Sequence, residues 1–563
     1  MQTFEELSQE RKDLQAKGHL PEWYTTQAWQ MFKAKYMYEP DALYGRHKTI
    51  AKTLASYLPK HMQAYYQERF FEEMWSGRLS PASPTLANVG TNRGLGVSCS
   101  GQDIGDSVDS FYGNLHEAAV LSKNAFGTSG NFDNVRGRGT PISKGGVANG
   151  VREVIDDYFT MAKKIAQGGN RRGSFAAYIS IEHPDWDECI DDLVINTDGK
   201  NYGWIIKDSF ITKLICGDED AQRRFTKALH TKLITGKGYF FFIDKANRAR
   251  PQMYKDLGLD VKATNLCTEI MLHSSEEYTY SCVLASLNLV HWEDIKTHDT
   301  ISVANVFLDC VVEDFLQTSK DIKGLEKVRA FTEKSRAVGL GVMGFHTLCQ
   351  MKRIPMDGLE ASFLNQEIFT AMQKTSLLAS QEMAQVLGEP EWCKGYGVRN
   401  THRLAQAPTK STGLLMGGVS EGINPDPGMV FEAASAAGEL TRIVPVIYEL
   451  MKERGVYNKD TIKRIIDNLG SVQQETWLTD EEKLVFRTAF EMNQHALLRL
   501  ASQRQPKLCQ GQSINLYIPG EDSEELISDL ITECFLNENI LSQYYIYSRN
   551  GVVVKDECVA CQV

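Results

Sequence analysis

Residues 265–289 read NLCTEIMLHSSEEYTYSCVLASLNL and place three reactive side chains close together. In an extended segment side chains alternate between faces, so Asn265, Cys267 and Glu269 should point the same way, about 6.5 Å between successive members. This amide, thiol and carboxylate suit chemistry on a sugar carbon that bears hydroxyl groups. A thiyl radical on Cys267 could abstract hydrogen, Glu269 could take a hydroxyl proton and Asn265 could hold that hydroxyl. The motif alone favours the alternative, a buried cysteine between two surface polar residues.

Further thiols lie on both sides of this segment. Cys99 occurs in GVSCSG and Cys282 in YSCVLASLNL. If both faced one substrate they could supply two electrons and form a disulfide; the alternative is two more buried cysteines, and sequence spacing does not decide. Cys558 and Cys561 form a Cys-x-x-Cys pair near the last residue. A zinc site needs four ligands, and no second pair or nearby histidine accompanies these two, so a mobile dithiol is the better interpretation and no metal site is predicted.

Outward from residues 265–289, helical and strand patterns alternate along the chain. The first ~80 residues carry apolar side chains at helical spacing. Later helices are predicted at 107–125, 150–167, 301–317 and 363–387, and strands at 174–181, 238–244, 337–345, 411–418 and 542–548. Strands separated by helices predict an α/β fold with a mostly parallel sheet.

Composition limits the classes of protein. The chain has 563 residues, a net charge of −11 and no apolar run near the ~18 residues that a membrane span needs. The acidic balance argues against binding a long nucleic acid. The N-terminus lacks the apolar core of a signal peptide, so we expect a cytoplasmic location. Twelve cysteines are too few for a disulfide scaffold of this length.

Taken together, these motifs resemble the large, catalytic subunit of class I ribonucleotide reductases over nearly the whole chain. The family shares an Asn-x-Cys-x-Glu finger, an upstream Ser-Cys pair, here Ser98-Cys99, and a later Cys-x-x-x-Ser-x-Asn-Leu, here 282–289. The resemblance implies a ten-stranded α/β barrel of two five-stranded parallel halves around a central finger loop. We therefore expect a helical region at 1–80, the barrel at 81–550 and a redox-active tail at 551–563.

The resemblance also implies nucleotide-binding loops. The segments 136–146 and 168–185 resemble two specificity loops, and AQAPTKSTGLLMGG (405–418) resembles a substrate-phosphate loop. Lys410 is unusual for that loop. The implied substrate-binding residues are Ser83, Ser98, Pro408, Thr409, Lys410, Ser411 and Thr412; the implied effector-binding residues are Asp106, Arg136, Arg171 and Arg172. For any single loop, a glycine-rich turn with solvated arginines is the simpler alternative.

Tyr544-Tyr545 resembles the stacked pair that relays a radical from a separate small subunit to the thiyl cysteine. Adjacent tyrosines in a strand ordinarily point to opposite faces as packing residues, which is the alternative. In the implied chemistry Cys267 starts the reaction, Cys99 and Cys282 reduce the substrate, and the tail dithiol restores them.

The implied partners are a ribonucleotide di- or triphosphate, a ferritin-like small subunit that holds the radical cofactor, thioredoxin or glutaredoxin, and a second copy in a homodimer. No tightly bound cofactor is expected in this chain, only a dNTP or ATP effector, with or without Mg²⁺. Larger family members begin with an ATP-binding cone, for which we find no room before Cys99. A cobalamin-dependent class II enzyme, a glycyl-radical enzyme and a catalytically silent regulatory subunit are the alternatives; Tyr544-Tyr545 argues against the first, the dithiol tail against the second and the intact cysteines against the third.

Overall fold

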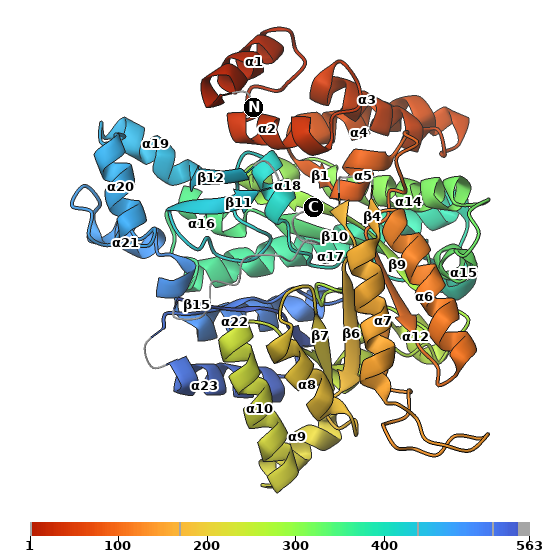
Figure 1. The fold of residues 1–563 in the computed structure, drawn as a ribbon. Helices are drawn as coiled ribbons and strands as arrows, with labels where there is room; N and C mark the ends of the chain where they lie inside the picture. The colour runs from red at the N-terminus through yellow and green to blue at the C-terminus, as the bar shows by residue number, and fades with distance from the viewer. Residues whose placement is uncertain (1–2, 168–170, 436–437, 521–522, 550–563) are drawn as a thin grey trace.

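A computed structural model describes residues 3–167, 171–435, 438–520 and 523–549. The chain begins with helices, as the apolar spacing predicts (Figure 1). They are α1 (Phe4–Ala16), α2 (Thr26–Lys35), α3 (Ala42–Ala55) and α4 (Lys60–Trp75). A capping box between Thr3 and Glu6 starts α1. The apolar faces of these helices join the largest core cluster, which also takes in the long helices α14 (Thr300–Thr318) and α17 (Leu359–Leu387).

Five parallel strands form the first half of a barrel, with backbone pairing in chain order. They are β2 (Cys99–Asp103), β3 (Gly127–Asn131), β6 (Phe175–Ser180), β7 (Tyr202–Ile206) and β8 (Tyr239–Phe242). Every residue of these strands is buried, because helices cover the outer face and the finger fills the inside. The connecting helices include α6 (Val108–Lys123), α7 (Val151–Lys164), α8 (Trp186–Ile195) and α10 (Glu219–Thr235).

The second half is also parallel but more fragmented. β9 (Tyr280–Asn288) pairs with β10 (Val338–Met343), which continues through a bridge from Leu340 to Leu404. Residues 404–406 bridge in turn to Gln512. The last pairing joins β13 (Leu516–Ile518) to β15 (Ile546–Ser548), after the short β14 (Ser542–Gln543). Each half therefore contributes five segments within the described residues.

Two antiparallel seams close the barrel. β9 pairs with β2 at one seam, and β14 pairs with β8 at the other. The expected ten-stranded barrel of two parallel halves is confirmed for the described residues. Between the halves, a bridge from Val261 to His273 closes the base of the finger loop, and Cys267 at its tip packs among Tyr178, Ile205 and Phe241 of the barrel strands.

The remaining elements complete the outer layers and the connections. They are β1 (Leu79–Pro81), α5 (Ser83–Asn88), β4 (Ala166–Gln167), β5 (Arg171–Arg172), α9 (Asp208–Ile215), α11 (Ile243–Ala249), α12 (Gln252–Asp256), α13 (Trp292–Ile295), α15 (Glu326–Ser335), α16 (Phe345–Met351), α18 (Lys410–Leu415), β11 (Val430–Ser435), β12 (Gly438–Ile443), α19 (Pro445–Glu453), α20 (Lys459–Asp467), α21 (Asp480–Val485), α22 (Gln494–Arg504) and α23 (Ser523–Leu536), with 3-10 turns at Leu289–His291, Glu391–Cys393, Ala489–Glu491 and Gln505–Lys507. No helix of the described residues is long and apolar enough to cross a membrane.

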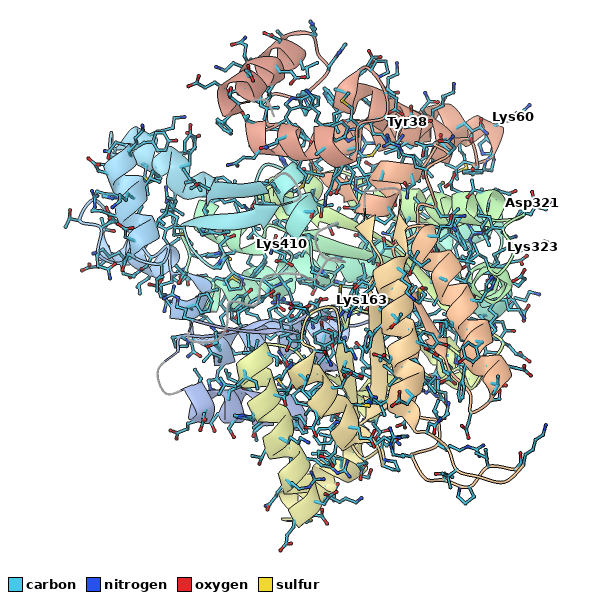
Figure 2. All side chains as sticks on the ribbon, viewed as in Figure 1. Tyr38, Lys60, Lys163, Asp321, Lys323 and Lys410 are labelled. Carbon is cyan, nitrogen blue, oxygen red and sulfur yellow. The ribbon has the colours of Figure 1, made fainter. Side chains whose placement is uncertain are left out.

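One predicted strand is wrong. Residues 411–418 were expected to be extended, yet Lys410 begins the helix α18, and Gly417 and Gly418 end the turn that follows with φ values of 95° and 75° (Figure 2). A short apolar run is buried equally well as a strand or as one helical turn, so its composition does not distinguish them. The helix predicted at 150–167 likewise ends at Lys164, and Ala166–Gln167 pairs as β4.

Candidate active site

A cavity opens beside the finger tip, and both predicted catalytic residues and predicted substrate-binding residues line it. The lining residues come from the finger, from strands β1, β2, β3 and β9, from α5, and from α18 and the loop before it. The lining residues are Ser80, Pro81, Ala82, Ser83, Pro84, Ser98, Cys99, Gly127, Leu266, Cys267, Glu269, Leu284, Ala285, Ser286, Ala407, Pro408, Thr409 and Thr412. Segments more than 300 residues apart in sequence thus share one chamber.

The finger tip is a turn rather than the extended segment that we predicted. Thr268 has φ 71°, and its N–H donates to Asn265 O (3.2 Å). A β-branched residue rarely adopts this left-handed conformation, and Ser542 Oγ supports it by donating to Thr268 O (3.0 Å). The alternation of faces assumed for 265–269 is therefore wrong. Cys267 and Glu269 nevertheless both reach the cavity, because the turn itself projects them there.

The two outer thiols lie opposite each other. The register of β2 against β9 makes Cys99 and Cys282 direct partners, and both side chains are thiols rather than halves of a disulfide. Directly opposed residues in an antiparallel pair have Cα atoms about 4.5–5.5 Å apart, within the ~4.4–6.8 Å range of disulfides. Asn265 Nδ2 donates to Cys99 Sγ (3.4 Å). Gln510 Nε2 donates to Cys282 Sγ (3.6 Å), and burial raises the pKa of Cys282 well above its usual value, so this thiol stays protonated.

Ser513 connects the backbone carbonyl of Cys267 to the Glu269 carboxylate, and sequence reasoning missed it. Its Oγ lies 3.1 Å from Glu269 Oε2 and 2.5 Å from Cys267 O. The backbone of Gly511 adds a hydrogen bond from its N–H to Glu269 O (2.8 Å). The signal that could have found Ser513 and Gln510 is the polar run QGQS at 510–513, which is buried throughout and so needs polar partners.

Tyr544 and Tyr545 lie on one side of the strand instead of on opposite faces. The regular pairing is interrupted between β14 and β15, and the two rings approach to 4.1 Å between centroids at 50°. Tyr544 Oη donates to Cys267 Sγ (3.6 Å). A third tyrosine that the sequence did not single out, Tyr239 of β8, donates from its Oη to Tyr545 Oη (2.9 Å), and its ring lies 4.8 Å from that of Tyr544. The phenols thus form a continuous group that ends at the finger thiol.

A buried lysine anchors this tyrosine group. Lys232 is fully buried and donates to Tyr544 O (2.9 Å) and Gly238 O (2.8 Å). Burial lowers the pKa of Lys232 well below its usual value. Because the ammonium bonds two backbone carbonyls, it holds the main chain of Tyr544 against the loop before β8.

The predicted phosphate loop borders the cavity. Pro408, Thr409 and Thr412 line the chamber opposite Ser83, which begins α5. Thr409 Oγ1 accepts from the N–H of Gly422 (2.8 Å). Of the other predicted substrate residues, Ser98 lines the cavity with a buried hydroxyl that has no hydrogen-bond partner in the described chain, whereas Lys410 and Ser411 are absent from the lining.

The predicted effector residues lie away from the cavity. Arg136 and Asp106 form an ion pair (Nε to Oδ2, 2.6 Å) at the start of the exposed loop 136–149, drawn in orange in Figure 1. Arg171–Arg172 forms β5, paired with β4, and the residues between these strands lie outside the described part of the chain. Cys558 and Cys561 also lie outside it. The roles of all these residues stay predictions.

The fold and site define a barrel oxidoreductase in which two thiols and a carboxylate line one cavity and a third thiol, that of Cys282, lies on the strand position opposite Cys99. Comparisons with known proteins agree. The ribonucleotide reductase barrel-domain family matches residues 97–219, 207–392 and 389–538, and its all-alpha domain matches 22–94. A putative ribonucleoside-diphosphate reductase large subunit of Frog virus 3 is 30% identical, with 96% of this chain and 98% of that protein covered. The large chain of Schizosaccharomyces pombe is 26% identical over 78% of this chain and 63% of its own. The class Id ribonucleotide reductase alpha subunit of Actinobacillus ureae superposes with a TM-score of 0.86 at 34% identity, covering 95% of this chain and 99% of that one.

The chain belongs to the ribonucleotide reductase large-subunit family. It is the catalytic subunit of such a reductase, an oxidoreductase of deoxyribonucleotide synthesis.

Proposed function

We propose that this chain reduces ribonucleoside di- or triphosphates to 2′-deoxyribonucleotides in the cavity beside the finger tip, with a radical supplied by a separate small subunit. The observation that carries the proposal is the position of Cys267. Its Sγ lies 3.6 Å from Tyr544 Oη, on a finger that also presents Glu269 to the cavity shared with Cys99. A thiol held between a phenol chain and a substrate chamber can be oxidised from one side and react on the other.

The steps balance as follows. Tyr545 and Tyr544 relay the oxidising equivalent, and Cys267 loses an electron and a proton to become a thiyl. The thiyl takes the hydrogen from C3′, and Glu269 takes the proton of the 3′-hydroxyl. The 2′-hydroxyl leaves as water. Cys99 and Cys282 supply two electrons and two protons, one proton to the leaving water and one to C2′, and become a disulfide. Glu269 then returns its proton to the 3′-oxygen, and Cys267 returns its hydrogen to C3′ and becomes a thiyl again.

The remaining residues serve binding and turnover. Ser83, Ser98, Pro408, Thr409 and Thr412 hold the substrate, with Lys410 and Ser411 at the start of α18 next to the phosphates. A nucleoside triphosphate effector, with or without Mg²⁺, binds near Asp106, Arg136, Arg171 and Arg172 at the interface of a homodimer. Cys558 and Cys561 reduce the Cys99–Cys282 disulfide by exchange, and thioredoxin or glutaredoxin resets them.

The test is multiple-turnover reduction of ribonucleotides, assayed with a candidate ferritin-like small subunit, without it, and with adenosylcobalamin in its place. Turnover that requires the small subunit supports the proposal. Turnover with cobalamin alone would replace it with a class II enzyme, and silence in every arm, with effector binding intact, would indicate a regulatory subunit. The double variant Cys558→Ser/Cys561→Ser should lose thioredoxin-driven turnover and regain it with a small dithiol.

A further inference from the structure

A second, smaller cavity lies behind the catalytic chamber. The volume open to the centre of a water-sized sphere is about 20 Å³, against about 70 Å³ in the catalytic cavity. It is enclosed between α22, the segment after the phosphate loop and the strand segment before β13. The lining residues are Met356, Ile423, Asn424, Pro425, Leu497, Leu500, Ala501, Arg504, Ile514 and Asn515. Most of this lining is apolar, so the few polar groups determine what the cavity can hold.

Arg504 places a positive charge in this cavity. Its side chain is buried, with 2% of the residue exposed. Nε donates to Asn365 Oδ1 (2.9 Å), and the guanidinium lies 5.7 Å from the Phe345 ring and 5.4 Å from the Phe369 ring. Neither Nη group has an acceptor, and no carboxylate pairs with Arg504, among the described residues. A guanidinium carries five N–H donors, and the described residues accept only one of those of Arg504, which lines the cavity.

Asn424 adds a further donor to the same cavity. This residue is 4% exposed, and its Nδ2 is buried without a hydrogen-bond partner in the described chain. The acceptor that Asn515 offers is already used, because its Oδ1 accepts from the N–H of Tyr545 (3.3 Å). The cavity therefore presents donors and one unpaired charge, and buried polar groups of this kind are normally satisfied.

Burial also affects the charge itself. It lowers the pKa of Arg504 to about 9, so the guanidinium remains protonated at neutral pH. An uncompensated buried cation is unfavourable because the apolar surroundings do not replace its hydration. The two aromatic rings that the guanidinium contacts offset part of this loss through cation–π interactions.

We propose that this cavity binds one small monovalent inorganic anion of the chloride class, held by Arg504 and Asn424. One positive charge matches one negative charge, whereas a dianion would leave a net buried charge. The volume excludes a nucleotide, and a spherical anion accepts from a guanidinium and an amide at the same time.

The position links the anion to the active site. Ile423–Pro425 follows Gly422, whose N–H donates to Thr409 Oγ1 of the phosphate loop. Ile514 and Asn515 follow Ser513, and Asn515 holds the backbone of Tyr545. A bound anion therefore stabilises two segments at once: residues 423–425, which follow the phosphate loop, and residues 514–515, which hold the backbone of Tyr545.

Crystals of the full chain grown in sodium bromide test the site directly, because bromide gives an anomalous signal. We expect one peak within hydrogen-bond distance of Arg504 and Asn424. In parallel, the melting temperature should be higher by about 2 °C or more in sodium chloride than in sodium gluconate at equal ionic strength. No peak and equal melting temperatures in the two salts would mean a water-filled cavity and overturn the proposal.

Variants make the test specific. Asn424→Asp supplies a fixed carboxylate beside Arg504, so it should lose both the bromide peak and the chloride response while remaining folded in gluconate. Arg504→Met should also lose the response; if it fails to fold, Asn424→Asp still decides. Arg499→Met removes an exposed charge from the same helix α22 and should keep the full response. A chloride response retained in Asn424→Asp contradicts the site.

Discussion

The finger tip around Cys267 and the surface around Arg136 hold their polar groups in opposite ways. Glu269 and Cys267 are 1% and 7% exposed, and hydrogen bonds from two distant chain segments, residues 511–513 and Tyr544, orient them. The side chains of Arg136 and Asp106 are 37% and 28% exposed and bond to each other. The groups at the finger tip are therefore held in place by the protein itself, whereas the proposed effector, if it binds at Arg136 and Asp106, must displace their ion pair.

This difference has an energetic consequence. A buried group that loses its partner retains its full desolvation penalty, so substitutions at the finger tip should have large effects. An exposed ion pair contributes little because water and salt screen it. The loss of activity and stability on substitution should therefore be larger at the finger tip than at the exposed ion pair.

The largest effect is expected for Cys267→Ser. Turnover should fall below detection while substrate binding stays nearly intact, because an alkoxyl radical is far harder to generate than a thiyl. Steady-state assays and nucleotide-binding titrations measure the two properties. The matched control is Cys216→Ser, an exposed thiol just after α9, which should retain full turnover. Multiple turnover by the Cys267 variant would exclude the radical role.

The second-largest loss of turnover is expected for Tyr544→Phe and Tyr545→Phe. Each keeps the ring packing but cannot be oxidised at accessible potentials, so turnover should nearly vanish while the fold and small-subunit binding persist. The lost hydroxyl alone costs about 1 kcal/mol of stability. The control Tyr158→Phe removes another buried hydroxyl, one that donates to Phe111 O, and should retain activity. Near-normal turnover in both relay variants would favour simple packing and reopen the cobalamin alternative.

Ser513→Ala should have an intermediate effect. Loss of the hydrogen bond to Glu269 should lower kcat about tenfold, equivalent to ~1.4 kcal/mol, with little change in KM. Because Ser513 positions Glu269, the acidic limb of the kcat–pH profile should also shift. Ser380→Ala, which removes a buried hydroxyl bonded to Asn400, is the control and should leave that profile unchanged. An unchanged profile in both variants would assign Ser513 a purely structural role.

The smallest effect on the protein itself is expected for Arg136→Ala. Breaking an exposed pair should change the free energy of unfolding by less than about 0.5 kcal/mol. Effector affinity should nevertheless fall by about tenfold, because a phosphate contact is lost. Thermal melting and effector titration measure the two, and Lys144→Ala, an exposed charge in the same loop, is the control. Unchanged effector affinity would remove Arg136 from the effector site.

The sequence predicted the long, regular helices and strands better than the short, irregular segments. The helices at 107–125, 301–317 and 363–387 and the strands at 174–181 and 238–244 are confirmed, because long periodic patterns determine them locally. Residues 411–418 and the finger 265–269 were assigned wrong local structures. Both segments are short and buried on all sides, so their conformation depends on neighbours that are distant in sequence.

The same contrast applies to site residues. Motif order pointed to Cys99, Cys267 and Cys282, but Ser513, Gln510, Tyr239 and Lys232 carry no motif. Each of these four acts through a contact across more than 200 residues or across the strand seams. Only folding brings such pairs together, and a lone serine or tyrosine gives no sign of its distant partner.

The sequence by itself determined the α/β class and the helical N-terminal region, and it predicted which thiols, carboxylate and phenols take part, because side-chain chemistry and periodicity are local properties. Only the tertiary structure decided that Cys99 opposes Cys282, that the finger is a turn with Thr268 in a left-handed conformation, and that Tyr544 and Tyr545 share one side with Tyr239. It alone also left Arg504 without a carboxylate partner among the described residues. These features depend on strand register and on what occupies the space around each group, and neither is a property of a chain segment in isolation.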